Sequence, residues 1–207
     1  RYCRHCLEEQ YHQYGEFFWS RLWYIQGANC CSKHKVKLSE FLQPAHLNGR
    51  HQFIPACFIL DRKQSHNPAH ELDLIVSRRV DELLNLPPTT SPTFHQWSQF
   101  YQRIAKRLGF NKGSKHIDHS KIYSTVIKTW NLKWLQQHHL DKLKSETCWL
   151  KAIFRKHRKS FSYLEHIIVL ETFFAKEWTW TAILSEIHQL PSHPSDTDKP
   201  IQKIKFK

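Results

Sequence analysis

The sequence contains no methionine at any of its 207 positions, including the first. Because the chain opens on Arg1, we expect it to be an internal piece of a longer protein. Long apolar runs are absent as well, since none approaches the roughly 18 residues that a membrane-spanning helix needs. We therefore expect no membrane partner.

Enzyme signatures are also missing. The sequence has no P-loop, no HExxH or GxSxG motif and no glycine pattern of a Rossmann fold. We therefore predict a chain without catalytic activity. A metal-dependent nuclease remains the alternative, because His116 and His119 flank Asp118 at close spacing. Three further carboxylates could be assembled into a similar site, although their spacing does not support one: Asp61, Asp73 and Asp81.

Acidic residues are scarce relative to basic ones. The chain has 18 Asp and Glu against 31 Lys and Arg, a net charge of +13 before its 16 histidines are counted. Such an excess indicates a polyanionic partner, either nucleic acid or an anionic membrane surface. The other interpretation is a solubilising charge balanced outside this chain. A content of 40 % hydrophobic and 14 % aromatic residues predicts a packed core rather than disorder.

The six cysteines are unevenly distributed, which favours a metal site in a reducing compartment over disulfides. Cys3 and Cys6 form a C-x2-C pair, and Cys31 with His34 forms a C-x2-H pair further along. Two such pairs can close a tetrahedron around Zn²⁺, and four protein ligands leave no position for an activated water. We therefore predict one structural zinc ion bound by these four residues.

The remaining cysteines are weaker candidates for the metal. Cys30 is the rival to Cys31, but it has the wrong spacing to His34. Cys57 and Cys148 stand alone in apolar segments, and we predict that both are core residues.

The periodicity of apolar residues predicts a mainly α chain with a small zinc-binding β-hairpin or knuckle module at its N-terminus. Short β-like pieces are expected at Phe17–Ile25 and Lys35–Phe41. Helical spacing predicts six further segments: Glu71–Leu86, Phe94–Leu108, Asp118–Trp130, Glu146–Ser160, Tyr163–Phe174 and Thr179–Leu190, with a helical or irregular joint at Leu132–Leu143.

These elements suggest five consecutive regions. Two amphipathic helices across a glycine-containing turn are typical of a helix-turn-helix-like unit, and Pro87 and Pro88 mark a linker before it. The predicted regions are a zinc-binding module at 1–60, a connecting helix and linker at 61–93, a helix-turn-helix-like unit at 94–131, a second helical DNA-binding unit at 132–190 and a basic linker or tail at 191–207.

The sharpest basic signal lies in residues 146–160. On a helical wheel, the apolar side chains of Trp149, Leu150, Ile153 and Phe154 lie opposite a cationic face that contains no acid. Such a face can meet phosphates, and its arginines can bind guanine edges. The other interpretation is an ordinary solvated face. The predicted DNA contacts are Lys151, Arg155, Arg158 and Lys159, with Lys156 at the boundary.

A second basic cluster crosses the turn of the predicted helix-turn-helix-like unit, where such units approach the DNA backbone. The alternative is a mobile charged turn. Its members are Lys106, Arg107, Lys112, Lys115 and His116. Charge and pattern together favour double-stranded DNA as the partner, with a zinc-containing protein-interaction scaffold as the second alternative function.

Several motifs are similar to those of the TniQ/TnsD family of transposition proteins. The two Cys/His pairs, the segment Tyr14–Arg21 (YGEFFWSR) and the block Thr147–Leu164 (TCWLKAIFRKHRKSFSYL) resemble family motifs, as do Trp97–Arg103 and Ser114–Ile117. The departures lie beside the ligand positions: Arg4 and Ser32 replace prolines of the pattern, and Lys35 replaces a glycine.

The resemblance, closest to the TnsD branch, implies a role in selecting the target site of a transposon. Members of that branch recognise a fixed chromosomal attachment site, which in the best-known group is the end of the glucosamine-synthase gene. They then recruit the AAA+ regulator TnsC. The resemblance further implies a bacterial cytoplasmic, nucleoid-associated protein, and it places the zinc ligands on Cys3, Cys6, Cys31 and His34.

Overall fold

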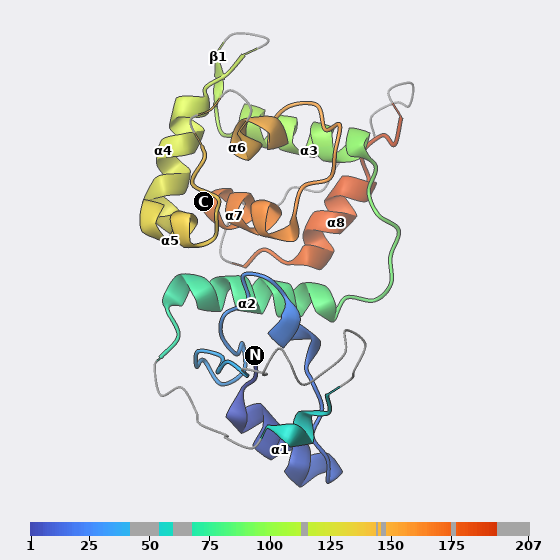
Figure 1. The fold of residues 1–207 in the computed structure, drawn as a ribbon. Helices are drawn as coiled ribbons and strands as arrows, with labels where there is room; N and C mark the ends of the chain where they lie inside the picture. Colours follow the sequence, from blue (N-terminus) through green and yellow to red (C-terminus); the bar gives the residue numbers. More distant parts are fainter. Residues whose placement is uncertain are drawn as a thin grey trace. The chain divides into compact units, whose positions relative to one another are not determined.

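The computed structural model describes two compact, mainly helical units, Arg1–Asn85 and Leu86–Lys207, each of which is considered by itself (Figure 1). The boundary falls inside the predicted connecting segment 61–93. The residues whose structure is described are 1–41, 54–59, 68–112, 116–143, 145, 148–174 and 177–193.

The first unit begins with a helix that the sequence analysis did not predict, α1 (Arg4–Tyr14). Gly15 ends it in the left-handed conformation, with φ 73°, and donates its N–H to the carbonyl of Tyr11. A glycine adopts this conformation without a steric penalty, which suits it to the end of a helix. The other elements of this unit are η1 (Arg21–Tyr24), η2 (Ala56–Phe58) and α2 (Glu71–Leu84).

The β-like pieces expected in this unit are not regular strands. The expected strand Phe17–Ile25 contains the 3₁₀ turn η1 instead. Among the described residues of the unit, strand pairing is limited to isolated antiparallel bridges. These bridges join Tyr2 to Ser39, Cys30 to Lys37 and Val36 to Pro68.

The core of the first unit forms where α2 packs against η1. Leu22 and Trp23 of η1 are buried together with Val76 and Val80 of α2. The prediction of a helix at Glu71–Leu86 is confirmed to within two residues at its end. Acidic side chains in the first turn of α2 favour this helix, because they face the positive end of its dipole.

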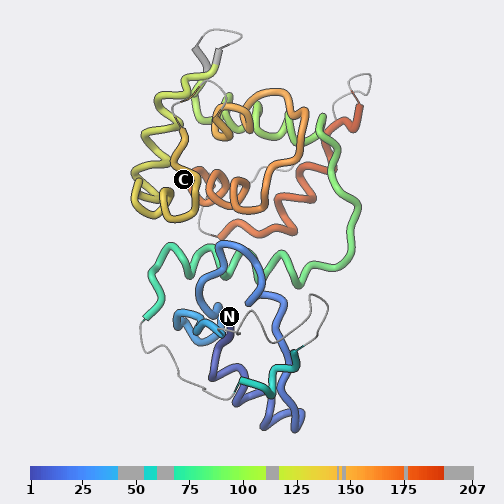
Figure 2. The backbone as a smooth tube through the Cα atoms, viewed as in Figure 1, coloured from blue at the N-terminus to red at the C-terminus, as the bar shows by residue number. Residues whose placement is uncertain are grey.

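The second unit contains the remaining elements of the chain, whose backbone path is drawn in Figure 2. The predicted helices near 94–108, 118–130, 163–174 and 179–190 are confirmed. The elements in order are α3 (Phe94–Arg107), β1 (Asn111–Lys112), β2 (His116–Ile117), α4 (His119–Trp130), α5 (Leu132–Gln137), α6 (Trp149–Ile153), α7 (Tyr163–Phe173) and α8 (Trp180–His188).

Helix α7 is the centre of this unit. Nearly all of its side chains are buried, as expected for a helix that is apolar around its whole circumference. Helix α4 packs against α7, and α3 packs against α8. The indole of Trp130 on α4 donates a hydrogen bond of 3.1 Å to each of two oxygens of α7, the carbonyl of Ile168 and the hydroxyl of Thr172.

The ends of α3 and α7 carry reciprocal caps. Thr93 and Gln96 form a capping box at the start of α3, and Ser162 and Glu165 form one at the start of α7. In each box a hydroxyl accepts from a free helical N–H, and the longer side chain accepts from the N–H of the capping residue. These four residues therefore set where the two helices begin.

The connection between α3 and α4 differs from the short turn of the predicted helix-turn-helix-like unit. It is an antiparallel hairpin in which Asn111 pairs with Ile117 and Lys112 with His116. The N–H of Asp118 closes its base on the carbonyl of Phe110 at 2.5 Å. The main packing partner of α3 is α8 and that of α4 is α7, so these two helices are not each other's main partners.

Candidate metal centre and basic loop

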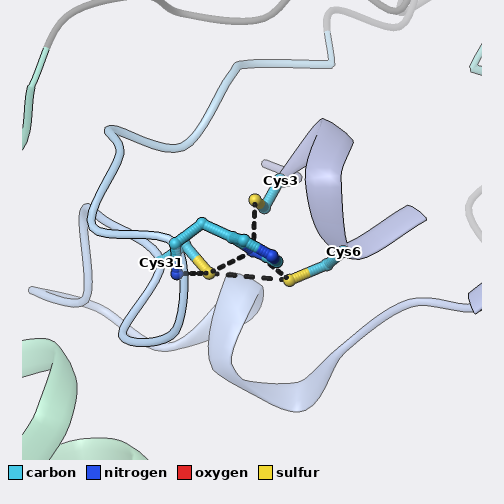
Figure 3. Close-up of side chains that lie close together, drawn as sticks. Cys3, Cys6 and Cys31 are labelled. Carbon is cyan, nitrogen blue, oxygen red and sulfur yellow. Dashed lines mark hydrogen bonds between the residues drawn. The ribbon is translucent and has the colours of Figure 1, made fainter. Parts of the chain in front are cut away.

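Four side chains in the first unit converge to a cluster that could hold a metal ion. The sulfurs of Cys3, Cys6 and Cys31 and a ring nitrogen of His34 all lie within 4.8 Å of one another. Figure 3 shows the three sulfurs turned toward a common centre. The cluster contains the same four residues that the sequence predicts as metal ligands.

The separations in the cluster suit a small tetrahedral ion. His34 Nδ1 lies 3.5 Å from Cys3 Sγ, 3.3 Å from Cys6 Sγ and 3.5 Å from Cys31 Sγ. The sulfurs of Cys6 and Cys31 are 3.5 Å apart. Ordinary zinc bond lengths give a tetrahedron with edges of about 3.6 Å from sulfur to nitrogen and about 3.8 Å between sulfurs. A slight expansion of the cluster would therefore admit the ion.

The two ligand pairs are presented by different local structures. The first pair was expected on a tight turn, but Cys3 caps the N-terminus of α1 and Cys6 lies in its first turn. This position favours thiolates, because the N-terminus of a helix is its positive end. The second pair does occupy a turn, in which the N–H of His34 donates to Cys31 Sγ at 3.3 Å. Lys35 completes this turn with φ 56°.

The three thiols hold their protons unequally. Hydrogen bonds from Cys3 and Cys6 keep the pKa of Cys31 far below the usual value of a thiol. The pKa of Cys3 is raised to about 11, chiefly because its thiol donates to Cys31. Hydrogen bonds to Cys3 and Cys31 also raise the pKa of Cys6. A metal ion bound here would need all three sulfurs as thiolates, so its binding would release the protons that the thiols hold.

Glu9 supports the histidine of the cluster, and the sequence analysis missed it. Its Oε1 lies 3.2 Å from His34 Nε2, and its Oε2 lies 2.6 Å from Lys33 Nζ. A proton on Nε2 leaves the lone pair of Nδ1 facing the sulfurs. Carboxylates commonly orient metal-binding histidines in this way. The signal in the sequence that could have identified Glu9 was its spacing, because Glu9 follows Cys6 by one helical turn of α1.

The other cysteines lie outside the cluster. Cys30 is buried, and its thiol donates to the hydroxyl of Ser77 at 3.1 Å. Cys148 is buried and caps α6, which confirms it as a core residue. The same prediction for Cys57 is wrong, because this residue is exposed. It lies on the outer side of η2, whereas Ala56 of η2 and Ile59 after it are buried.

The basic block of the second unit is a loop, and the predicted helix at Glu146–Ser160 is wrong over most of its length. Helix α6 spans only Trp149–Ile153. The predicted apolar side is confirmed in part, since Leu150, Ile153 and Phe154 are buried. After Phe154 the chain runs without helix to α7, and we call residues 155–160 the basic loop.

Beyond the end of α6, side chains take the hydrogen bonds that a longer helix would need. In a continuing helix, the N–H of His157 would donate to the carbonyl of Ile153. This N–H donates instead to Ser98 Oγ at 2.7 Å. The carbonyl of Ile153 pairs with His157 Nε2 at 2.8 Å. Repulsion between like charges one turn apart, such as Arg155 and Lys159, adds a smaller cost to any longer helix.

The basic loop presents its cations outward. His157 is 5 % exposed and marks the inward side of the loop. The four cations around it are all exposed, namely Arg155, Lys156, Arg158 and Lys159. Lys151 precedes them on α6 and is half-buried. The residues expected on one helical face are therefore grouped by a loop.

The second basic cluster is only partly described. Lys106 is exposed on the last turn of α3. Arg107 pairs with the buried carboxylate of Glu186, with 3.1 Å between Nη1 and Oε1. This partner neutralises the charge that Arg107 was expected to offer DNA. Lys115 lies outside the described residues, as do the side chains of Lys112 and His116.

Two carboxylates of the nuclease alternative have other roles in the structure. Asp118 is buried and caps α4 by accepting from the N–H groups of Ser120 and Lys121. Asp81 accepts a hydrogen bond of 2.9 Å from Ser32. Asp61 lies outside the described residues. These contacts leave the carboxylates of Asp118 and Asp81 occupied in local structure.

Comparison with known proteins identifies the family. A family model described as "Tn7-like transposition protein D" matches residues 76–194, which include the basic loop. A relative from Escherichia coli, "Transposon Tn7 transposition protein TnsD", is 37 % identical over 210 aligned positions, or 98 % of this chain. The chain belongs to the TnsD family.

This TnsD-family chain spans 40 % of the length of that relative. The metal cluster lies outside the segment matched by the family model, which begins at residue 76. In the described part of the chain, no helix is long and apolar enough to cross a membrane.

Proposed function

We propose that this chain is part of a target selector that binds double-stranded DNA at a chromosomal attachment site and marks it for transposon insertion. Membership of the TnsD family supports a role in transposition. The observation that carries the DNA-binding part is the basic loop, in which four exposed cations surround one buried residue.

The basic loop has the chemistry that recognition of a duplex requires. Lysines suit phosphate oxygens, whereas the forked guanidinium of an arginine also fits the O6 and N7 acceptors of guanine. We assign base contacts to Arg155 and Arg158, and phosphate contacts to Lys156 and Lys159. Lys151 and Lys106 are secondary phosphate contacts. Arg107 is left out because Glu186 neutralises it.

The test is binding of the whole chain to two labelled duplexes across a salt series. One duplex carries the end of a glucosamine-synthase gene, and the other has the same bases in scrambled order. Arg155→Ala and Arg158→Ala should weaken binding to the first duplex about 10- to 100-fold and reduce the preference for it. Lys156→Ala should weaken both alike and lower the salt slope by about 0.9 per lost contact. Lys37→Ala, an exposed lysine elsewhere, is the charge-matched control.

Binding that is unchanged in all of these loop variants would contradict the assignment and direct attention to the hairpin between α3 and α4. The nuclease alternative is tested with the same protein. We expect no cleavage of plasmid with magnesium or manganese. Cleavage that is lost in His119→Ala would overturn the expectation of a non-catalytic chain.

We further propose that the Cys/His cluster holds one structural Zn²⁺ ion. Its support is the convergence of three thiols and one imidazole, whose ligand atoms lie within 4.8 Å of one another. A bound zinc ion would link the start of α1, through its cysteines, to the turn at residues 31–34. Metal analysis should find about one zinc per chain, and Cys6→Ser should abolish it and unfold residues 1–40. Cys30→Ser, which removes a buried thiol outside the cluster, should retain the ion.

The family resemblance implies the AAA+ regulator TnsC as the protein partner, and we propose this chain as one part of that contact. Co-purification with TnsC, with and without the attachment-site duplex, tests the proposal. Binding to TnsC without any affinity for DNA would instead favour the zinc-containing interaction scaffold.

A further inference from the structure

We propose that Ser98 and His157 are positioning residues that hold the basic loop in one shape before its anionic partner arrives. This inference rests on the proposed DNA-binding function, because it concerns how the loop is prepared for a duplex. Neither residue offers a charge to the partner, since both are buried, at 5 % exposure each.

The attachment begins with a relay of two hydrogen bonds. The N–H of His157 donates to Ser98 Oγ at 2.7 Å, and the same hydroxyl donates to the carbonyl of Phe94 at 2.6 Å. The serine therefore uses its acceptor and its proton at once, which fixes the orientation of its O–H. This relay ties the middle of the loop to α3, against which Figure 1 draws α6 and the chain that leaves it.

The imidazole of His157 supplies a second attachment. Its Nε2 donates to the carbonyl of Ile153 at 2.8 Å, which closes the loop onto the end of α6. The ring stacks on Tyr101, with centroids 5.8 Å apart and planes 22° apart. Phe161 covers the ring at 4.6 Å from the other end of the loop. The loop is thus held at its start, its middle and its end.

The charges of the loop follow from these attachments. His157 is flanked by Lys156 and Arg158, so burying its ring turns both neighbours outward. Without the attachments, four like charges would repel one another and spread the loop over many conformations. Binding to DNA would then have to order the loop, and that entropy would be lost from the affinity. The structure assigns Ser98 and His157 the task of removing this cost.

Two variants separate positioning from contact. Ser98→Ala removes the relay with little change in volume. His157→Phe retains an aromatic ring against Tyr101 and Phe161 but removes the bond to Ile153. Each should weaken binding to the attachment-site duplex about 3- to 10-fold by releasing loop conformations. Because no cation is lost, the dependence of affinity on salt should keep the slope of the parent, whereas Arg158→Ala should make it shallower.

A second measurement needs no DNA. The loop contains four trypsin sites, at Arg155, Lys156, Arg158 and Lys159. If the loop is held, trypsin should cut there slowly in the whole parent chain and several-fold faster in Ser98→Ala. Thermal melting of each variant shows whether the second unit remains folded. Ser120→Ala, which changes an exposed serine outside the loop, is the matched control.

The outcomes distinguish the inference from the proposed function. Faster cleavage together with weaker binding at an unchanged salt slope supports it. Unchanged cleavage and binding in Ser98→Ala and His157→Phe would overturn it, while weakened binding in Arg158→Ala would leave the proposed function standing. Normal binding in every loop variant would instead overturn the proposed DNA contact. A shallower salt slope in Ser98→Ala would also reject positioning, because it would mean a lost phosphate contact.

Discussion

The buried imidazole of His166 should control how the second unit responds to acid. It lies on α7 at 8 % exposure, and a hydrogen bond of 2.6 Å joins its Nδ1 to the phenolic oxygen of Tyr101. Burial, reinforced by the nearby ring of His157, lowers the pKa of His166 to about 3. Burial also lowers the pKa of His157, and it raises that of Tyr101, which keeps the phenol protonated.

The magnitude follows from the difference between the folded and unfolded states. An unfolded histidine has a pKa near 6.5 and binds a proton as the pH falls below that value, while folded His166 stays neutral until about pH 3. The contribution to stability is therefore complete above pH 6.5 and declines by about 1.4 kcal/mol for each pH unit below it. Between pH 7 and pH 5, His166 alone should reduce the free energy of unfolding by about 2 kcal/mol.

The assay is urea unfolding of the whole chain at these two pH values, followed by tryptophan fluorescence. His166→Asn removes the titrating group and keeps a side-chain amide that can pair with the hydroxyl of Tyr101. This variant should be less stable than the parent at pH 7 but should lose about 2 kcal/mol less on going to pH 5. His188→Asn removes an exposed imidazole of the same unit and should respond to pH like the parent.

Acid also weakens any metal bound by the cysteines, but parent and variants share that effect, so the difference between them isolates His166. An equal loss of stability in the parent and in His166→Asn would refute the reasoning. It would mean that the folded unit admits water or a proton to this site.

Three further predictions concern local structure. Glu9→Gln removes the carboxylate that orients His34 and should lower zinc affinity about 10- to 100-fold in a chelator competition. The control Glu16→Gln, at an exposed site outside the cluster, should leave zinc affinity unchanged. Equal zinc affinities of the two variants would show that Glu9 has no such role. Lys35→Gly relieves the backbone strain of a lysine at φ 56° and should raise the stability of the first unit by up to about 1 kcal/mol. The control Lys37→Gly, at an extended bridge position, should lower that stability by about as much. Destabilisation by Lys35→Gly would refute the strain argument. Ser162→Ala breaks the capping box of α7 and should cost about 1 kcal/mol in thermal melting, and a variant as stable as the parent would show that the box is not needed.

The long helices were predictable because their apolar residues repeat at helical spacing and their ends carry local signals. Thr93 and Ser162 begin α3 and α7, and Gly109 follows α3 with φ 67°. Such signals act over a few residues, so a sequence contains them directly. Helix α1 was missed although Gly15 marks its end, because its N-cap is Cys3, which belongs to the cluster, and its apolar face is narrow.

The metal cluster was also predictable as a set of residues. Two closely spaced pairs restrict which cysteines can meet, and the spacing to His34 favoured Cys31 over Cys30. The role of Glu9 was not predicted, because it depends on α1 bringing a carboxylate to the far side of the imidazole. A sequence pattern records ligand spacing but does not record which side of a ring is covered.

The sequence by itself determined the family motifs, the excess of basic charge, the ligand set of the cluster and most helices, since each depends on residues close together in the chain. Tertiary structure alone decided the form of the basic block. Ser98 lies 59 positions before His157, yet its hydroxyl accepts an N–H that a longer α6 would have paired with its own backbone. Similarly, Glu186 of α8 neutralises Arg107 of α3. Local periodicity predicts a helix wherever its spacing is met, but a hydrogen bond from a distant residue can end that helix, and only the folded chain brings the two partners together.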